Sequence, residues 1–428
     1  MVTDYPQALS AVGLGTFVAS HAKSGKPLVQ PRMGFGPAAA MRRGLAAVRW
    51  SRAATVGTIT LDSYTRVGDE TGAERALASQ AGLNGYPLLT HSSRTTRELL
   101  SGVAGPDFPV QVRHGSALAS RIMDKALQCG LTAAEGGPVS YCLPYGRVPL
   151  PVATRDWAES CRILAQFPQA HLESFGGCMM GQLCPPSLLV ALSVLECMFF
   201  RQHGLRSLSL SYAQQASHEQ DREAVSVLRA LAGEFLGDVD WHVVVYTYMG
   251  VFPKTRAGAT ELLRQSARLA VETGSERLIV KTIAEAHRIP DITDNVAALE
   301  AAHDAALSFE RLPWTQRQIA EGGEIYAEAR ALVETVLNLS ENIGAALVRA
   351  FSRGLLDVPY CLHPDNRNRA RATLMPDGRL RWASVGGMPL PADAVARGRS
   401  AGCPPASAEL LGMLSWVRRR YDTESFAA

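Results

Sequence analysis

The sequence predicts an α/β protein: a (β/α)8 TIM barrel followed by a C-terminal α+β extension. Short β-like runs that end in glycines or polar residues alternate with helical patterns at a spacing of roughly 25–40 residues, which is typical of βαβ units and a parallel sheet. Eight or nine such units fit a closed barrel better than an open doubly wound sheet. No GxGxxG or GxxxxGK[ST] sequence opens any unit, so a nucleotide-binding fold has no support.

The elements follow one another in a regular order. The candidate strands are 27–30, 55–61, 83–88, 109–112, 139–143, 170–175, 207–211, 242–247 and 277–281. Helical stretches between them include "ETGAERALASQAG", "SALASRIMDKALQCG" and "TRAGATELLRQSARLAVETG". We predict an N-terminal segment over 1–24, the barrel over 25–352 and the extension over 353–428, where prolines and a "PDG" turn become frequent. The final "SAELLGMLSWVRRRYD" predicts an amphipathic helix.

The composition excludes several classes of protein. With 47% hydrophobic and 19% charged residues and a mean hydropathy near zero, the chain resembles a soluble globular protein, and a net charge of +3 gives little support for nucleic-acid binding. Eight scattered cysteines without a CxxC pair indicate reduced thiols in the cytoplasm. The N-terminus lacks a signal-peptide pattern. The apolar run "PPSLLVALSVLECMFF" contains Glu196, so we expect a buried helix there rather than a membrane span.

Three predicted strand ends deliver an arginine: Arg32 in "QPRMG", Arg66 in "LDSYTR" and Arg113 in "VRHG". In a barrel of this type, functional side chains gather at the C-terminal ends of the strands, so the three guanidiniums would converge at one mouth. Each guanidinium is a planar fork suited to a carboxylate. One such arginine alone is more simply explained by a surface salt bridge. Three at strand ends predict an anionic ligand.

The same predicted ends supply a carboxylate, Glu135, and two hydroxyls, Tyr141 and Tyr145, in "EGGPVSYCLPY". Glu135 would pair with a substrate ammonium or accept a proton, or would simply form a salt bridge with one of the arginines. The two tyrosines are candidates for orienting a substrate, with the core as the alternative. Together these groups predict a site for an amino dicarboxylic acid.

A second candidate pair, Lys281 and Glu285, lies in "VKTIAEAHRIP" at i, i+4 spacing. A helical salt bridge explains this spacing, and the spacing alone favours it. The alternative places both side chains at the barrel mouth, where they would hydrogen-bond a ribose or another polyol.

The sequence offers no obvious nucleophile or metal site. His91, His114 and His242 form no defensible metal set, and no HxH, HExxH or GxSxG sequence is present. Anion-binding side chains without a nucleophile indicate a binding protein, unless a cofactor performs the difficult step of a reaction.

Many short motifs occur in the order found in the large subunit of glutamate mutase, also called the methylaspartate mutase epsilon chain. They include "LVQPRMG", "TLDSYTR", "LNGYP", "VRHG", "EGGPVSYCLPY", "CPPS", "YMGVFP", "LIVKTIAEAHRIP" and "LLDVPY". The resemblance runs from about residue 27 to about residue 390. It implies a TIM barrel and a radical isomerase that interconverts L-glutamate and (2S,3S)-3-methylaspartate with adenosylcobalamin. The cofactor would then perform the difficult step.

The resemblance also implies roles for matching residues. The three strand-end arginines look like the arginine claw that holds the two substrate carboxylates in this family. Glu135 matches the carboxylate that contacts the substrate amine and acts as a base, and Tyr141 and Tyr145 match tyrosines that orient the substrate. Lys281 and Glu285 resemble a pair near the adenosyl ribose. Four further residues match positions close to the cofactor: Gly34, Thr60, Pro144 and Met249.

The resemblance implies partners as well. The cobalamin-binding DxHxxG motif is absent from this sequence, and in the family it lies on a separate small, sigma-type subunit, so we expect such a partner and a dimer of large subunits, hence a heterotetramer. The chain departs from the family in a shorter N-terminal part and in "SYAQQASHEQD", over residues 211–221. These departures keep two alternatives open: a homologous radical mutase acting on a different amino acid in secondary metabolism, and a non-catalytic amino-acid-binding or scaffold barrel.

Overall fold

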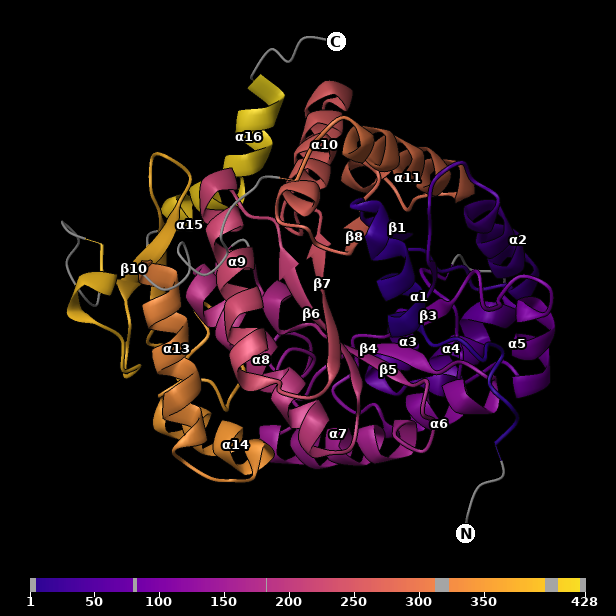
Figure 1. Ribbon diagram of the computed structural model, residues 1–428, viewed down its shortest axis with the longest axis horizontal. Helices are drawn as coiled ribbons and strands as arrows, with labels where there is room; N and C mark the ends of the chain where they lie inside the picture. The colour runs from indigo at the N-terminus through magenta and orange to yellow at the C-terminus, as the bar shows by residue number, and fades with distance from the viewer. Residues whose placement is uncertain (1–4, 80–82, 182, 312–322, 397–406, 424–428) are drawn as a thin grey trace.

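Eight parallel strands form the centre of the protein in a computed structural model, which describes residues 5–79, 83–181, 183–311, 323–396 and 407–423 (Figure 1). The strands are β1 Leu28–Pro31, β2 Gly57–Thr60, β3 Val110–Arg113, β4 Ala133–Gly136, β5 His171–Ser174, β6 Ser207–Ala213, β7 Asp240–Tyr246 and β8 Arg277–Val280. Their order in the sheet is β1-β8-β7-β6-β5-β4-β3-β2, so each strand lies beside its neighbour in sequence and β1 also pairs with β8.

The first and second strands close the sheet. The amide of Val29 donates to the carbonyl of Ala54 at 2.9 Å, and the amide of Val56 donates to the carbonyl of Val29 at 3.2 Å. A parallel bridge joins Val29 to Thr55. The eight strands therefore form a closed parallel barrel, and the predicted fold class is confirmed.

Two of the nine predicted strands were wrong. Residues 83–88 form no strand, and only Tyr86 bridges to Leu61. Residues 139–143 lie in a turn, and the true strand, β4, precedes them at Ala133–Gly136. The apolar run in 139–143 resembles a strand because the turn is buried, whereas β4 consists of two alanines, a glutamate and a glycine. A buried turn thus has the same apolar sequence pattern as a buried strand.

Helices follow the strands and cover the outside of the barrel. They are α2 Ala38–Arg49, α3 Ser63–Val67, α4 Glu70–Ala78, α5 Ser93–Leu100, α6 Ser120–Gln128, α7 Leu150–Leu164, α8 Pro186–Gln202, α9 His218–Phe235, α10 Arg256–Glu272 and α11 Ile292–Leu307. An N-terminal helix, α1 Leu14–His21, packs Leu14 and Val18 against the starts of β1 and β4. The short 3₁₀ helices are η1 Ala22–Ser24, η2 Gly176–Cys178, η3 Ile283–Ala286 and η4 Ala392–Ala394.

The most apolar helix, α8, is buried around most of its circumference. It packs between β6, α9 and the later helix α13 Glu324–Leu337, which explains why apolar residues occur on all of its sides. The expected buried helix is therefore present. None of the helices in the described ranges is long and apolar enough to cross a membrane.

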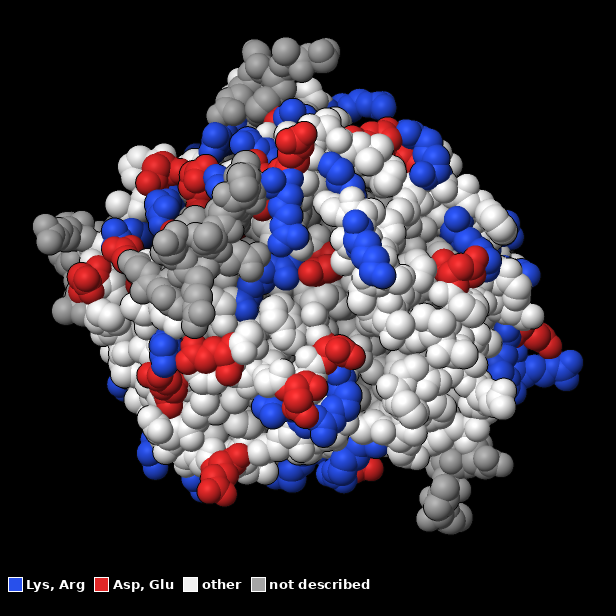
Figure 2. All heavy atoms as spheres, viewed as in Figure 1, with Lys and Arg blue, Asp and Glu red and all other residues white. Residues whose placement is uncertain are grey.

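The C-terminal part adds helices and a small sheet to the side of the barrel. After α13 come α14 Ile343–Arg353 and an antiparallel hairpin of β9 Arg371–Leu374 and β10 Leu380–Ser384. The predicted terminal helix is divided into α15 Ser407–Leu414 and α16 Trp416–Thr423, and α16 packs on α10. The face drawn in Figure 2 has interspersed basic and acidic side chains, in agreement with the small net charge.

Candidate active site

The C-terminal ends of the barrel strands bring the predicted site residues to one mouth. Arg113 ends β3, Glu135 lies in β4, Arg32 follows β1 directly and Lys281 follows β8 directly. Arg66 differs from the prediction, because it lies in the short helix α3 after β2 rather than at the strand end. The side chain of Asp62 starts this helix by accepting the amides of Tyr64 and Thr65, at 2.9 and 3.0 Å.

Glu135 is the most contacted group at the mouth. Its Oε2 accepts from Arg113 Nε and from the Tyr246 hydroxyl, both at 2.7 Å, and its Oε1 accepts a hydrogen bond from the Tyr141 hydroxyl. All four side chains are buried. Burial raises the pKa of both tyrosines well above the usual range, and the charge of Glu135 adds to the rise, so both hydroxyls are donors at neutral pH.

The expected alternative for Glu135, a salt bridge to an arginine, is present with Arg113. This bridge leaves other donors unused: Arg113 Nη1 and Arg66 Nε are both buried and make no hydrogen bond within the described structure. Buried guanidinium N–H groups are normally paired, so these two atoms suit the oxygens of an anionic ligand.

The two predicted tyrosines occupy the turn after β4. Gly136 has φ of +137°, a conformation that favours glycine, and it turns the chain so that Tyr141 returns to Glu135. The rings of Tyr141 and Tyr145 meet edge to face at 5.9 Å, and the Arg66 guanidinium lies 5.5 Å from the centre of the Tyr145 ring. Tyr145 is 41% exposed, so it is not a core residue.

Tyr145 also connects the arginines. Burial of its hydroxyl raises the pKa, and the positive charges of Arg32 and Arg66 oppose that rise. Of the two, the Arg66 guanidinium lies directly over the ring of this phenol. In this arrangement Arg66 lies over the Tyr145 ring and Arg113 forms an ion pair with Glu135. The convergence of the three arginines on one ligand stays a prediction.

Lys281 and Glu285 form the predicted ion pair, with 3.6 Å between Nζ and Oε2. The same oxygen lies 3.5 Å from Arg32 Nη1, so the pair continues into the arginine group. Glu285 belongs to η3, where its Oε1 accepts the amide of Thr282 at 3.0 Å in a capping box. Burial lowers the pKa of Lys281, and its ammonium lies 4.7 Å from the centre of the Phe252 ring.

The four remaining predicted residues lie around this mouth. A Cβ at Gly34 would approach the carbonyl oxygen of Thr60 to 2.2 Å, so a side chain there would collide with the end of β2. Thr60 Oγ1 is buried and makes no hydrogen bond within the described residues. Pro144 and Met249 are both half-buried, and Met249 follows the end of β7.

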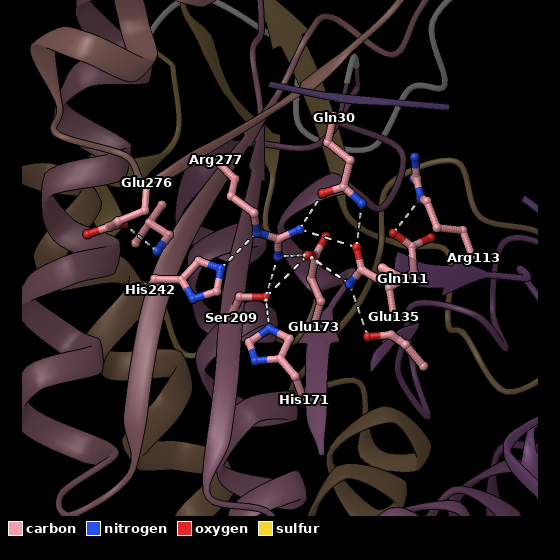
Figure 3. A network of polar contacts seen from close by, with 12 residues as sticks. Gln30, Gln111, Arg113, Glu135, His171, Glu173, Ser209, His242, Glu276 and Arg277 are labelled. Carbon is pink, nitrogen blue, oxygen red and sulfur yellow. Dashed lines mark hydrogen bonds and ion pairs between the residues drawn. The ribbon is translucent and has the colours of Figure 1, made fainter. Parts of the chain in front are cut away.

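A buried polar network lies directly beneath the mouth, in the interior of the barrel (Figure 3). Arg277 on β8 is fully buried and forms an ion pair with Glu173 on β5. It also donates to His242 Nε2 at 2.8 Å, Gln30 Oε1 at 2.5 Å and Gln111 Oε1 at 3.2 Å. Burial lowers the pKa of His242 well below its usual range, and the charge of Arg277 lowers it further. His242 is therefore a neutral acceptor and part of the barrel core.

Tyr246 joins this network to the mouth. Its hydroxyl contacts Glu135 Oε2 at 2.7 Å and also forms a hydrogen bond with Glu173 Oε1. Arg113 lies 5.1 Å from the centre of the Tyr246 ring. An uninterrupted chain of contacts thus runs from Arg113 through Glu135, Tyr246 and Glu173 to Arg277.

Sequence reasoning missed Tyr246, Glu173 and His114 as site residues. Burial lowers the pKa of His114 to about 3, and the charge of Arg66 contributes to this shift. Its Nδ1 accepts the amide of Ser116 at 3.1 Å, and its buried Nε2 has no hydrogen-bond partner among the described residues. A signal for Arg277 did exist, because a charged residue stands out in the otherwise apolar strand "RLIV", whereas Glu173 lies between other polar residues in "HLES".

Comparison with known proteins identifies the family. The sequence profile of the methylaspartate mutase E chain family (MutE) matches residues 13–401. The chain belongs to this family. The glutamate mutase epsilon subunit of Desulfitobacterium hafniense (strain Y51) is 32% identical over 348 residues, which cover 77% of this chain and 71% of the relative. That of Escherichia coli O157:H7 is 29% identical over 390 residues, 87% of this chain and 80% of the relative.

A third relative, the glutamate mutase epsilon subunit of Haloarcula marismortui, is 29% identical over 390 residues, which cover 86% of this chain and 77% of the relative. The family assignment made from the ordered motifs is therefore confirmed, and the methylaspartate mutase E chain family is a family of mutase subunits. In this member of the family, the motifs that carry the resemblance lie largely on the loops at the C-terminal ends of the strands.

Proposed function

We propose that this chain is the catalytic, substrate-binding subunit of an adenosylcobalamin-dependent carbon-skeleton mutase that interconverts L-glutamate and (2S,3S)-3-methylaspartate by a radical mechanism. The observation that carries the proposal is the combination of a buried carboxylate, Glu135, with unpaired guanidinium donors on Arg66 and Arg113 at one mouth. An amino dicarboxylate complements this set, because it offers two carboxylates to the arginines and an ammonium to Glu135. Family membership supports the same substrate.

The proposed roles of the side chains follow from their donor and acceptor atoms that have no hydrogen-bond partner or only one. Arg113 Nη1 and Arg66 Nε would donate to the substrate carboxylates, with Arg32 as the third arginine of the claw. Glu135 Oε2 already accepts two hydrogen bonds, whereas Oε1 accepts only that of Tyr141. We therefore assign the substrate ammonium, and the proton it gives up, to Glu135 Oε1.

Aromatic rings would exclude water from the reacting carbons. Tyr141 packs against Phe175 with ring centres 5.2 Å apart, and Phe175 packs against Tyr246 at 5.7 Å. These rings surround Glu135 on the inner side of the mouth, and Tyr145 covers the side of Arg66. A dry pocket strengthens the ion pairs that hold the substrate and protects reactive fragments from side reactions.

The mouth also fits the nucleoside part of adenosylcobalamin. When bound, this cofactor supplies the carbon radical that removes a hydrogen atom from the substrate. Thr60 Oγ1 lacks a hydrogen-bond partner in the described structure, and Lys281 and Glu285 present a donor and an acceptor, which suits the hydroxyls of a ribose. Gly34, Pro144 and Met249 would contribute uncharged contact surface next to them.

We assign the ligand of cobalt to a separate small subunit. The sequence contains one DxH, at Asp240 to His242, but no DxHxxG, and His242 is buried in the barrel with its Nε2 occupied by Arg277. A cobalamin-binding sigma-type subunit would then cover the mouth of the barrel. By the same resemblance we propose a dimer of large subunits and a heterotetramer with two small subunits.

Reconstitution tests the proposal. The purified chain is mixed with a small subunit that carries the DxHxxG motif, adenosylcobalamin and L-glutamate, and the methyl doublet of 3-methylaspartate is followed by proton NMR. Formation of this product supports the proposal. Turnover of another amino acid without turnover of L-glutamate would favour a mutase of different specificity. A chain that forms no cobalamin-dependent complex with any small subunit would favour the scaffold alternative.

A further inference from the structure

A separate cavity adjoins the candidate site on the side of β2, β3 and β4. It has a volume of about 360 Å³ and lies between α3, the start of α6 and the loop 145–148. It shares only Arg66 and Tyr145 with the residues assigned to substrate, and neither Glu135 nor Arg113 lines it. Its volume is in the range of small-molecule sites.

Exposed apolar side chains gather around this cavity. Val67 is 70% exposed and Leu118 is 43% exposed, and both line the cavity together with the exposed ring of Tyr145. Leu89 and Ile122 add further apolar surface to the wall. Single exposed apolar residues are common, but several around one concave surface indicate a place where an apolar group binds.

The charged groups at the cavity leave a surplus of positive charge. Asp156 is the one acidic side chain among the described lining residues, and it already accepts the amides of Ala119 and Ser120 at 2.5 and 3.0 Å and the Ser120 hydroxyl at 2.6 Å. Arg147 is exposed and forms no hydrogen bond or ion pair with any described residue, and Arg66 keeps a buried Nε without a partner. These two arginines, which both line the cavity, favour an anion.

We propose that this cavity is a second binding site for a small carboxylate with an apolar body, whose charged end lies on Arg147 and Arg66 and whose apolar end lies against Leu118 and Ile122. Because Arg66 faces both sites, a ligand here would compete with the amino dicarboxylate for one guanidinium. The competition rests on the proposed function, whereas binding itself does not. The site would therefore make the mutase sensitive to apolar carboxylates.

Ligand binding to the full chain, without small subunit or cofactor, tests the proposal. Titration calorimetry is performed with phenylacetate, its neutral amide phenylacetamide and the cation benzylamine. We expect phenylacetate to bind about tenfold or more tightly than either of the other two, because only the carboxylate pairs with the arginines. Arg147→Gln should weaken phenylacetate binding about fivefold to tenfold and leave phenylacetamide unchanged, while Arg43→Gln, a matched change on the exposed side of α2, should leave both unchanged.

A second variant tests the location. Leu118→Glu places a carboxylate at the rim and should abolish phenylacetate binding, whereas Leu362→Glu, the same change at a residue 83% exposed outside the cavity, should not. Equal binding of the three probes, absence of binding by all three, or unchanged binding in Leu118→Glu would overturn the proposal. If the chain turns over L-glutamate but does not bind phenylacetate, this site is refuted and the proposed function stays intact. If the chain binds phenylacetate but does not turn over L-glutamate, the proposed function is refuted and the second site stays intact.

Discussion

Tyr246 has one hydroxyl hydrogen and two carboxylate neighbours. Its oxygen lies 2.7 Å from Glu135 Oε2 and also forms a hydrogen bond with Glu173 Oε1. One hydrogen can serve only one of these contacts at a time, so the two carboxyl groups share one donor. Through this shared hydroxyl, the hydrogen bonding of Glu135 is linked to Glu173 in the barrel interior.

Arg113 provides the sharpest test of the arginine claw. In the reconstituted enzyme, Arg113→Lys should raise the KM for L-glutamate about tenfold to a hundredfold, because an ammonium cannot replace a guanidinium that serves Glu135 and a substrate carboxylate together. Arg43→Lys, on the exposed side of α2, is the matched control and should leave KM unchanged. Steady-state kinetics of both variants measure the effect. Unchanged kcat and KM in Arg113→Lys would contradict the role of Arg113.

At the scale of elements, the barrel strands carry polar side chains toward the interior. β5 and β8 are not neighbours in the sheet, since β6 and β7 lie between them, so the ion pair of Glu173 and Arg277 crosses the inside of the barrel. Gln30 on β1 and Gln111 on β3 complete the hydrogen bonds of the guanidinium. A buried pair of this kind is tolerated because the guanidinium also donates to His242, Gln30, Gln111 and Ser209.

Glu173→Gln should destabilise the protein by about 3–5 kcal/mol, because it leaves the charge of Arg277 buried without a counter-ion. The double variant Glu173→Gln/Arg277→Met should recover part of this loss, since the unpaired charge is removed with its partner. Urea unfolding of the two variants measures the difference. A double variant no more stable than Glu173→Gln alone would contradict this account of the ion pair.

Helix α8 holds the turn that carries Tyr141. Glu196 Oε1 accepts the amides of Val139 and Ser140 at 3.1 and 2.9 Å, and its Oε2 accepts the hydroxyls of Ser140 and Ser174 at 2.9 and 2.8 Å. A Cβ at Gly137 would lie 2.1 Å from this carboxyl group, so the second glycine of "EGG" is required for the contact. The position of Tyr141 at Glu135 thus depends on a carboxyl group from another element.

Burial raises the pKa of Glu196 to about 7, so the native carboxyl keeps its proton where the unfolded one, near 4.5, has lost it. Its contribution to stability is therefore fully present below pH 4.5 and is lost as the pH rises from about 4.5 to about 7, by up to about 3 kcal/mol. Glu196→Gln should remove this pH dependence, and Glu74→Gln, at an exposed site on α4, should retain it. Urea unfolding at a series of pH values measures it. A constant difference between the unaltered chain and Glu196→Gln would contradict the shift.

This turn also marks the limit of prediction from sequence. Residues 139–143 were predicted as a strand because they are mostly apolar, but they form a turn that is buried against Glu196 and aromatic rings. The true strand, β4, consists mostly of small residues and lacks a recognisable strand pattern. The arginines and Glu135 were predicted as site residues because their local motifs are specific. Tyr246, Glu173 and Arg277 meet only after β5, β7 and β8 have paired in one register, and no local pattern specifies that pairing.

At the scale of the whole molecule, the alternation of strands and helices was sufficient to predict a barrel, because eight parallel strands with helical crossovers close readily into one. The attachment of the C-terminal helices was not predictable. Asp422 on α16 accepts the amides of Lys254 and Thr255, at 3.0 and 2.9 Å, and the Thr255 hydroxyl at 2.8 Å. Val417 of the same helix packs in a cluster with Tyr248 and Phe252 at the end of β7.

The end of the chain thereby supports the mouth of the barrel, since Phe252 lies beneath the ammonium of Lys281. Asp422→Ala should reduce the stability of this attachment by about 1–2 kcal/mol, because three donors at the start of α10 lose their acceptor. Hydrogen exchange should then accelerate in α16 and in residues 251–255, while the barrel strands keep their protection. Asp377→Ala, in the exposed turn between β9 and β10, serves as the control. Unchanged exchange in α16 would show that its apolar contacts alone hold the helix on the barrel.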